Sequence, residues 1–410
     1  MRIRFAVMAS ALLATAFGQT HLPVPTGAFP VGRQMLLWSD PARPEDIGPT
    51  AGKPREVVAY VYYPAVAKGS HVEYFPGLAG LESAAETRIL RQQFGGLWNA
   101  VTAGTIQTNA YSGPPMPHGR TRFPVLFFSP GGQAPVLAYQ ILLEELASRG
   151  YVIFGLEHGT DSALIIRPDR TMITYVNRRP PDALPTVAYL EAVRDETVRR
   201  SADIVFGLDR IAAVAKEPGS TFRNRIDLSR IGVLGHSAGG QAAIRTCQID
   251  QRVRACLNLD GEMFGIPLGS TDPIPTVLPG KPTLAPVAVV YVAEPGPSDA
   301  QLAAVKVTRG QYEDWRAAKN RALRTFLQQN SRETHLITIT APGYVHASFM
   351  DVRLLGANPS LEATLNHRSG TNITRAFFDT QLRWGQKKNS RQFQVEPREG
   401  IQVEKLGIRR

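Results

Sequence analysis

A serine between two glycines is the residue in this chain with the clearest capacity for chemistry. Residues 235–239 read Gly-His-Ser-Ala-Gly and fit the pattern G-x-S-x-G. In that pattern a strained turn from strand to helix lifts a serine hydroxyl clear of a sheet, where it can attack an acyl carbon. An apolar run, residues 231–234, precedes the pattern, and helix-forming residues follow it. The spacing predicts that Ser237 is a nucleophile, and a tight strand-to-helix turn without chemistry is the alternative.

A nucleophilic serine needs a histidine as base and an acid that orients the histidine. Asp260 directly follows an apolar run and precedes a glycine, and a charge at the end of a buried strand needs a partner. His346 lies in a loop after the apolar run 336–340. The order serine, acid, histidine is that of α/β hydrolases. His158, which also follows an apolar run, is the alternative base, and a turn-forming Asp-Gly pair is the alternative reading of Asp260.

The elements expected to position these residues alternate between strands and helices. Strands are predicted at 57–63, 123–129, 151–156, 231–234, 255–259, 287–292 and 336–340, and helices at 136–149, 187–215, 241–247 and 312–329. Most of the strand segments are continuously apolar, as in a parallel sheet that is covered on both faces. The sequence therefore predicts an α/β-hydrolase fold, with a mostly parallel central sheet and helices on both faces.

The long helix predicted over residues 187–215 carries apolar residues at helical spacing. Val205, Leu208 and Ala212 follow the i, i+3, i+7 pattern of a stripe that faces the core. Asp203 is expected on one of the other faces.

The chain is expected to form one domain over residues 19–385. Two segments within it, 64–121 and 262–285, are rich in glycine and proline and are expected to be irregular insertions. Residues 386–410 contain seven Lys or Arg against three Glu. This basic C-terminal tail is interpreted as a solvated terminus, with contact to an anionic surface as the alternative.

The first 18 residues are typical of a secretory signal peptide. A basic start precedes an apolar run from residue 5 to residue 17, and small residues predict cleavage after residue 16 or 18. Thirteen apolar residues are fewer than the roughly 20 that a membrane-spanning helix needs. The protein is therefore expected to be exported, either periplasmic or secreted.

Composition and cysteine count narrow the chemistry further. The formal net charge is +11, yet the sequence contains no zinc-type Cys/His cluster, Walker loop or G-x-G-x-x-G pattern. We therefore expect no metal, no cofactor and no nucleic-acid partner. Cys247 and Cys256 can form a disulfide in an oxidising compartment, and buried free cysteines are the alternative.

Seven short segments occur in a specific order along the chain. They are FPVG at 29–32, YYPA at 62–65, FPVLFFSPGG at 123–132, GLEH at 155–158, GHSAGG at 235–240, NLDGEMFG at 258–265 and YVHASFMD at 344–351. Each is short, but the ordered set resembles the plasma-type (isoform II) platelet-activating factor acetylhydrolases and their bacterial relatives. The resemblance extends from Phe29 to about Trp384.

The resemblance implies a site and an activity. Ser237 would be the nucleophile, Asp260 the acid and His346 the base, while the backbone N–H groups of Gly132 and Ala238 would bind the oxyanion. It also implies a phospholipase A2-type reaction that removes a short sn-2 acyl group, such as the acetyl group of platelet-activating factor. The expected partner is a phospholipid or a small ester, with peripheral contact to a lipid surface.

Three positions depart from the family pattern. Pro130 stands where relatives usually have histidine, Ala238 stands where the vertebrate enzymes often have an aromatic residue, and Glu262 stands where they have tryptophan. These positions border the expected site, so they leave substrate preference open. A broad carboxylesterase, a polyester hydrolase and an inactive binding protein on the same fold remain as alternatives.

The segment 262–285 bears on acyl-chain length. Five prolines interrupt it, whereas a groove for long chains needs an extended apolar lining. This favours short acyl groups. The alternative is a mobile, lipid-facing flap formed by the apolar residues Phe264, Ile266, Leu268, Ile274 and Leu278.

Overall fold

The protein was analysed as a computed structural model, which describes residues 20–119, 121–180, 185–267, 270–278, 280–331, 333–356, 358–384 and 392–407. The predicted signal peptide lies outside the described residues. Within the described part of the chain, no helix is long and apolar enough to cross a membrane.

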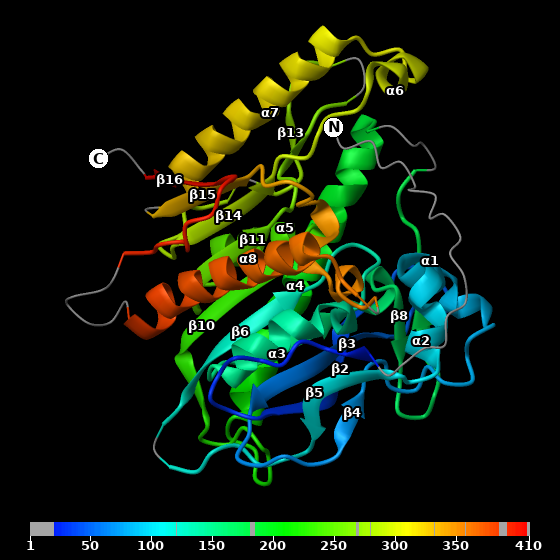
Figure 1. Ribbon diagram of the computed structural model, residues 1–410, viewed down its shortest axis with the longest axis vertical. Coiled ribbons are helices and arrows are strands. Elements are labelled where there is room, and N and C mark those ends of the chain that lie inside the picture. Colours follow the sequence, from blue (N-terminus) through cyan, green and yellow to red (C-terminus); the bar gives the residue numbers. More distant parts are fainter. Residues whose placement is uncertain are drawn as a thin grey trace.

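A twelve-stranded, mostly parallel sheet forms the centre of the molecule (Figure 1). Its main path runs β1 (Thr20–His21), β5 (Ile106–Ser112), β2 (Val31–Pro44), β3 (Pro54–Pro64), β7 (Val152–Glu157), β6 (Phe123–Ser129), β10 (Ile226–His236), β11 (Val253–Leu259), β14 (Val287–Val292), β15 (Thr334–Ile339) and β16 (Ile401–Leu406), with β4 (His71–Glu73) paired to β5. Along this path, the neighbouring strands β7, β6, β10, β11, β14 and β15 all run parallel to one another. All seven predicted strands are therefore confirmed as members of this sheet.

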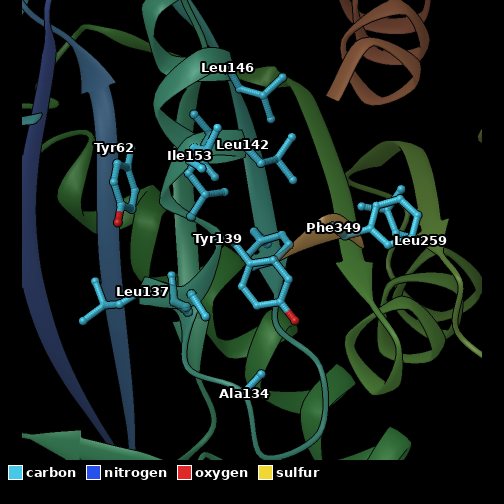
Figure 2. Close-up of a cluster of buried hydrophobic side chains, with 14 of the residues drawn as sticks. Tyr62, Ala134, Leu137, Tyr139, Leu142, Leu146, Ile153, Leu259 and Phe349 are labelled. Carbon is cyan, nitrogen blue, oxygen red and sulfur yellow. The ribbon is translucent and has the colours of Figure 1, made fainter. Parts of the chain in front are cut away.

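Helices cover both faces of the sheet. They are α1 (Arg88–Phe94), α2 (Trp98–Thr102), α3 (Gln140–Ser148), α4 (Val187–Val214), α5 (Ala238–Ile249), α6 (Asp299–Ala304), α7 (Arg309–Asn330) and α8 (Leu361–Phe378). Side chains of β6 alternate between two cores: Leu126 and Phe128 pack with α3 and α8, whereas Val125 and Phe127 pack with α4, α5 and α7. Figure 2 shows part of the first core, where Leu142 and Leu146 of α3 lie beside Ile153 of β7. The predicted α/β-hydrolase fold is therefore confirmed.

The buried stripe of α4 differs from the prediction. Ile204, Leu208 and Ile211 are buried in the core, and Asp203 is buried completely. A carboxylate can be buried here because arginines neutralise it: Arg55 donates to both of its oxygens, each at 2.8 Å. The partners come from other elements, Arg55 from β3 and Arg43 from β2, so the helical spacing of α4 alone did not predict the burial of Asp203.

Two segments expected to lie outside the regular structure contribute strands to the sheet. Residues 64–121 contain α1, α2 and β5, and β5 pairs with both β1 and β2. In the C-terminal segment, β16 pairs antiparallel with β15 over Ile401–Leu406. This edge strand is mostly exposed and polar, so it lacks the apolar run by which the central strands were predicted.

Cys247 and Cys256 form a disulfide, with 6.3 Å between their Cα atoms. The bond joins α5 to β11. It therefore ties the helix that begins after Ser237 to the strand that ends before Asp260.

Candidate active site

Ser237 occupies a strained turn between β10 and α5. Its φ of 54° and ψ of −121° belong to a region that L-residues rarely adopt, as a nucleophile elbow requires. Gly235 and Gly239 allow the close backbone approach that this turn requires. A β-carbon on Gly235 would overlap the backbone of Gly239, and one on Gly239 would overlap the carbonyl of Ser129. The turn holds the half-buried Ser237 at the carboxyl end of β10, where open α/β sheets bind their ligands.

Asp260 and His346 meet at the same edge of the sheet. Asp260 Oδ2 lies 2.6 Å from His346 Nδ1, while Oδ1 accepts a hydrogen bond from the backbone N–H of Val292 at 2.9 Å. The Asp260 side chain is 1% exposed and that of His346 is 27% exposed. In neutral His346 the proton on Nδ1 therefore faces the carboxylate, and the basic lone pair is on Nε2.

His236, next to Ser237 in the elbow, contacts the loop that carries His346. The two imidazole rings lie 4.4 Å apart between centroids. His236 Nε2 donates to the carbonyl of His346 at 2.9 Å, and Tyr139 donates its hydroxyl hydrogen to His236 Nδ1 at 2.8 Å. These contacts hold the loop after β15, which carries His346, against the turn that carries Ser237.

The loop after β6 lies against the start of α5. A β-carbon placed on Gly132 would be 3.8 Å from that of Ala238. Ala238 is the first residue of α5, so its N–H has no carbonyl partner within the helix. Arg200 donates to the carbonyl of Pro130 at 3.1 Å and supports the loop from beneath. The two predicted oxyanion donors, Gly132 and Ala238, therefore lie side by side, and Pro130 sits outside the pair.

His158, the alternative base, is sealed inside the protein. Its Nε2 lies 2.8 Å from Ser129 Oγ and its Nδ1 lies 2.9 Å from Asp203 Oδ2. All three side chains are fully buried, and burial lowers the pKa of His158 below its usual value. Ser129, His158 and Asp203 thus form a second Ser-His-Asp group that is closed to solvent. It holds the end of β6, from which the loop containing Gly132 (the Gly132 loop) continues.

Three contacts around the site have no signal in the sequence. Tyr139 accepts a hydrogen bond from Gly131 N–H at 3.1 Å, Arg200 holds the same loop, and Glu294 accepts one from the backbone N–H of His346. Arg200 and Glu294 are 70 and 52 positions from the groups that they support, whereas Tyr139 is eight positions from Gly131. Only the fold reveals that they meet.

The segment after Asp260 packs onto the protein. Phe264 makes an edge contact with Phe326 of α7, with ring centroids 6.0 Å apart. Ile266 is buried against Trp315 and its neighbours on α6 and α7. Glu262, one of the departures from the family pattern, pairs with Lys319. Phe264 and Ile266 therefore contact α7 and α6, although Phe264 stays half-buried. Leu268, which also belongs to the alternative flap, lies outside the described residues, and the flap remains a prediction.

Known proteins of similar sequence belong to one named family. The model of the family "Platelet-activating factor acetylhydrolase, isoform II" matches residues 14–187 and 216–281. A probable 1-alkyl-2-acetylglycerophosphocholine esterase of Arthroderma benhamiae is 29% identical over 275 residues, which cover 63% of this chain and 64% of that protein. The platelet-activating factor acetylhydrolase of Cavia porcellus is 24% identical over 288 residues, covering 63% and 59%. Both matches span less than two thirds of the relative's own length.

A solved structure extends the likeness of fold to nearly the whole chain. The ferulic acid esterase from Streptomyces cinnamoneus superimposes with a TM-score of 0.63 at 21% identity, covering 94% of this chain and 99% of that one. At this identity the likeness supports the fold alone.

Proposed function

The chain belongs to the platelet-activating factor acetylhydrolase, isoform II, family, and on that premise we propose that it is a serine ester hydrolase with Ser237, His346 and Asp260 as its triad. The observation that carries the proposal is the 2.6 Å contact between Asp260 and His346, beside the strained elbow of Ser237. Ser237, Asp260 and His346 follow three different strands of the sheet, which supports their proposed roles in acyl transfer.

The proposed reaction proceeds through an acyl-enzyme. His346 Nε2 takes the proton of Ser237 Oγ while Oγ bonds to the acyl carbon, and Asp260 stabilises the imidazolium that forms. The N–H groups of Gly132 and Ala238 bind the negative charge on the former carbonyl oxygen. The C–O bond to the alcohol then breaks, and His346 returns the proton to the leaving oxygen. Water, deprotonated by His346, releases the acid and restores Ser237.

We propose short acyl esters as substrates, in particular the sn-2 acetyl group of a glycerophospholipid. Family membership supports this choice, as does the name of the Arthroderma benhamiae relative, which is a probable esterase of 1-alkyl-2-acetylglycerophosphocholine. The burial of Ile266 against α6 and α7 removes one apolar side chain from any long acyl groove in the segment after Asp260.

Export of the protein and peripheral contact with lipid surfaces belong to the same proposal. The disulfide between Cys247 and Cys256 supports an oxidising compartment, because such bonds are rare in the cytosol.

The test is a chain-length series of p-nitrophenyl esters run beside 1-alkyl-2-acetylglycerophosphocholine. We expect acetyl and butyryl esters to be hydrolysed faster than C12 or longer ones, together with release of acetate from the phospholipid. A rate that rises steadily to C16 would contradict the short-acyl proposal. Rapid hydrolysis of short esters without hydrolysis of the phospholipid would identify a broad carboxylesterase.

A further inference from the structure

We infer that Arg179 forms an anion-binding subsite beside the Gly132 loop, and that the protein prefers esters that carry a carboxylate or phosphate close to the reacting carbonyl. The inference rests on the proposed esterase function and deepens it by naming a charge on the substrate. Neither family membership nor the triad assigns a role to Arg179.

The position of Arg179 relative to Gly132 is the first argument. A β-carbon placed on Gly132 would lie 3.6 Å from Nη2 of Arg179 and 3.7 Å from Oε1 of Glu196. Gly132 is half-buried, and the Arg179 side chain is 20% exposed. The guanidinium is thus part of the wall next to the proposed oxyanion donor. The substrate groups next to a carbonyl bound by the Gly132 N–H would therefore lie within reach of Arg179.

The charge of the surrounding cluster is the second argument. Glu196 lies between two arginines: it accepts from Nη2 of Arg179 at 2.5 Å and from Nε of Arg200 at 2.9 Å. Burial opposes ionisation of Glu196, but the Arg200 and Arg179 guanidinium groups outweigh it and hold the pKa of the carboxyl below its usual value. Two cations share the Glu196 carboxylate, so these three groups alone carry a net charge of about +1. Asp161, whose charge also acts on Glu196, is itself paired with Arg55 and Arg199.

The unused hydrogen-bonding capacity of Arg179 is the third argument. An arginine has five N–H donors. One Nη2 hydrogen serves Glu196, and Nη1 donates to the hydroxyl of Tyr189 at 3.2 Å, over whose ring the guanidinium lies at 5.6 Å. Nε is buried and has no hydrogen-bond partner among the described residues. A donor left unsatisfied in this way is costly, and the fixed guanidinium presents a fork that suits a carboxylate or phosphate.

Two pairs of substrates test the inference. For an anion on the acyl side, p-nitrophenyl acetate is compared with the mono-p-nitrophenyl ester of glutarate. For an anion on the alcohol side, phenyl acetate is compared with 4-acetoxyphenyl phosphate. In Arg179→Gln we expect kcat/KM to fall about tenfold or more for the anionic member of at least one pair, since a hydrogen bond to a charged group is lost, and to change less than about threefold for both neutral esters. The pair whose anionic member loses kcat/KM shows whether Arg179 binds an anion on the acyl side or on the alcohol side of the ester.

Two further variants separate recognition from structure. Arg179→Lys keeps the charge but loses the fork, so it should recover part of the preference. Arg194→Gln removes a more exposed positive charge from α4, where Nη2 of Arg194 lies 3.6 Å from Oε1 of Glu191, and should leave both substrate pairs unchanged. Labelling of Ser237 by a fluorophosphonate verifies that each variant is folded.

An equal loss on neutral and anionic esters in Arg179→Gln, or no loss on either, would overturn the inference while leaving the esterase intact. A wild-type protein that hydrolyses none of the four esters would overturn the esterase proposal and this inference with it. The two failures are therefore distinguishable.

Discussion

The imidazole of His236 donates from Nε2 to the backbone carbonyl of His346 at 2.9 Å. Because a carbonyl only accepts, Nε2 must carry the proton and Nδ1 must accept, which it does from Tyr139 at 2.8 Å. The Tyr139 hydroxyl in turn accepts from Gly131 N–H. One chain of hydrogen bonds therefore joins the Gly132 loop, the serine elbow and the loop of the proposed base.

Replacement of His236 by phenylalanine tests this connection. His236→Phe keeps an aromatic ring beside His346 but removes both hydrogen bonds, so the loop of the base loses its fixed position. We expect kcat on p-nitrophenyl acetate to fall about tenfold or more with little change in KM, because misplacement by about 1 Å can cost about 100-fold. Steady-state kinetics measure both. Tyr139→Phe removes the hydrogen bonds to Gly131 and to His236 Nδ1 but keeps the one from His236 to His346, so it should have the smaller effect. A wild-type kcat in His236→Phe would show that these hydrogen bonds have no influence on the reaction.

The two histidines that follow strands are distinguished by a pair of alanine variants. We expect His346→Ala to lose about 10⁴-fold in kcat, since members of a triad act as a unit. His158→Ala should retain activity within about tenfold, because its imidazole is buried against Ser129 and Asp203 and acts only on the position of the loop. Steady-state hydrolysis of p-nitrophenyl acetate measures both variants. Loss of activity in His158→Ala with survival in His346→Ala would mean that the base has been misassigned.

Asp203 is expected to stabilise the fold strongly. It is fully buried and accepts from Arg55 at 2.8 Å through each oxygen and from His158 at 2.9 Å. Removing one partner of a buried ion pair leaves the other charge uncompensated and costs about 3–5 kcal/mol. Asp203→Asn should therefore lower the free energy of unfolding in urea by about that amount.

A matched control for Asp203 lies on the same helix. Asp209 pairs with Arg252 at the surface, where its side chain is 62% exposed, and such pairs contribute less than about 1 kcal/mol. Asp209→Asn should therefore be nearly neutral. Equal unfolding free energies for the two variants would contradict the importance of the buried network.

The stability of the protein is expected to fall in mild acid because of His367. This histidine of α8 is buried, and its Nε2 has no hydrogen-bond partner among the described residues. Burial lowers its pKa to about 4 from the usual 6.5. Between these pH values the unfolded chain binds a proton that the folded protein does not, so stability is lost as the pH falls, by about 3 kcal/mol at pH 4.

Unfolding curves in urea at pH 7 and pH 4.5 measure this effect. His367→Gln cannot bind that proton, so its loss of stability over the same interval should be smaller than that of the wild type. His118→Gln, a change at an exposed position, should behave as the wild type does. Identical acid sensitivity of His367→Gln and the wild type would refute the role given to His367.

The three residues of the proposed triad were predictable because each follows an apolar strand. Buried parallel strands are continuous apolar runs, so the polar residues that end them, Ser237, Asp260 and the loop of His346, stand out in the sequence. The contact between Asp260 and His346 confirms that two of these residues come together.

The supporting network was not predictable in the same way. Asp203 looked like a surface residue of a helix because its partner Arg55 is 148 positions away. Strand β16 was predicted to be a solvated tail because its sequence has no continuous apolar run. Only its pairing with β15 identifies it as a strand. Tyr139 acquires its role through contacts with Gly131 and His236 that only the folded chain brings together. Contacts between distant segments, which local patterns do not encode, account for these differences.

The most direct test of the proposed serine hydrolase is covalent labelling of Ser237. A fluorophosphonate is attacked by an activated serine, which displaces fluoride and keeps the phosphonyl group. We expect folded wild-type protein to gain one phosphonyl adduct per chain by intact mass, on the peptide that contains Ser237, with parallel loss of p-nitrophenyl acetate hydrolysis. Ser237→Ala should gain none and should be inactive. Folded wild-type protein that stays unlabelled, or that is labelled and inactivated at another residue, would contradict the assignment of Ser237 as the nucleophile.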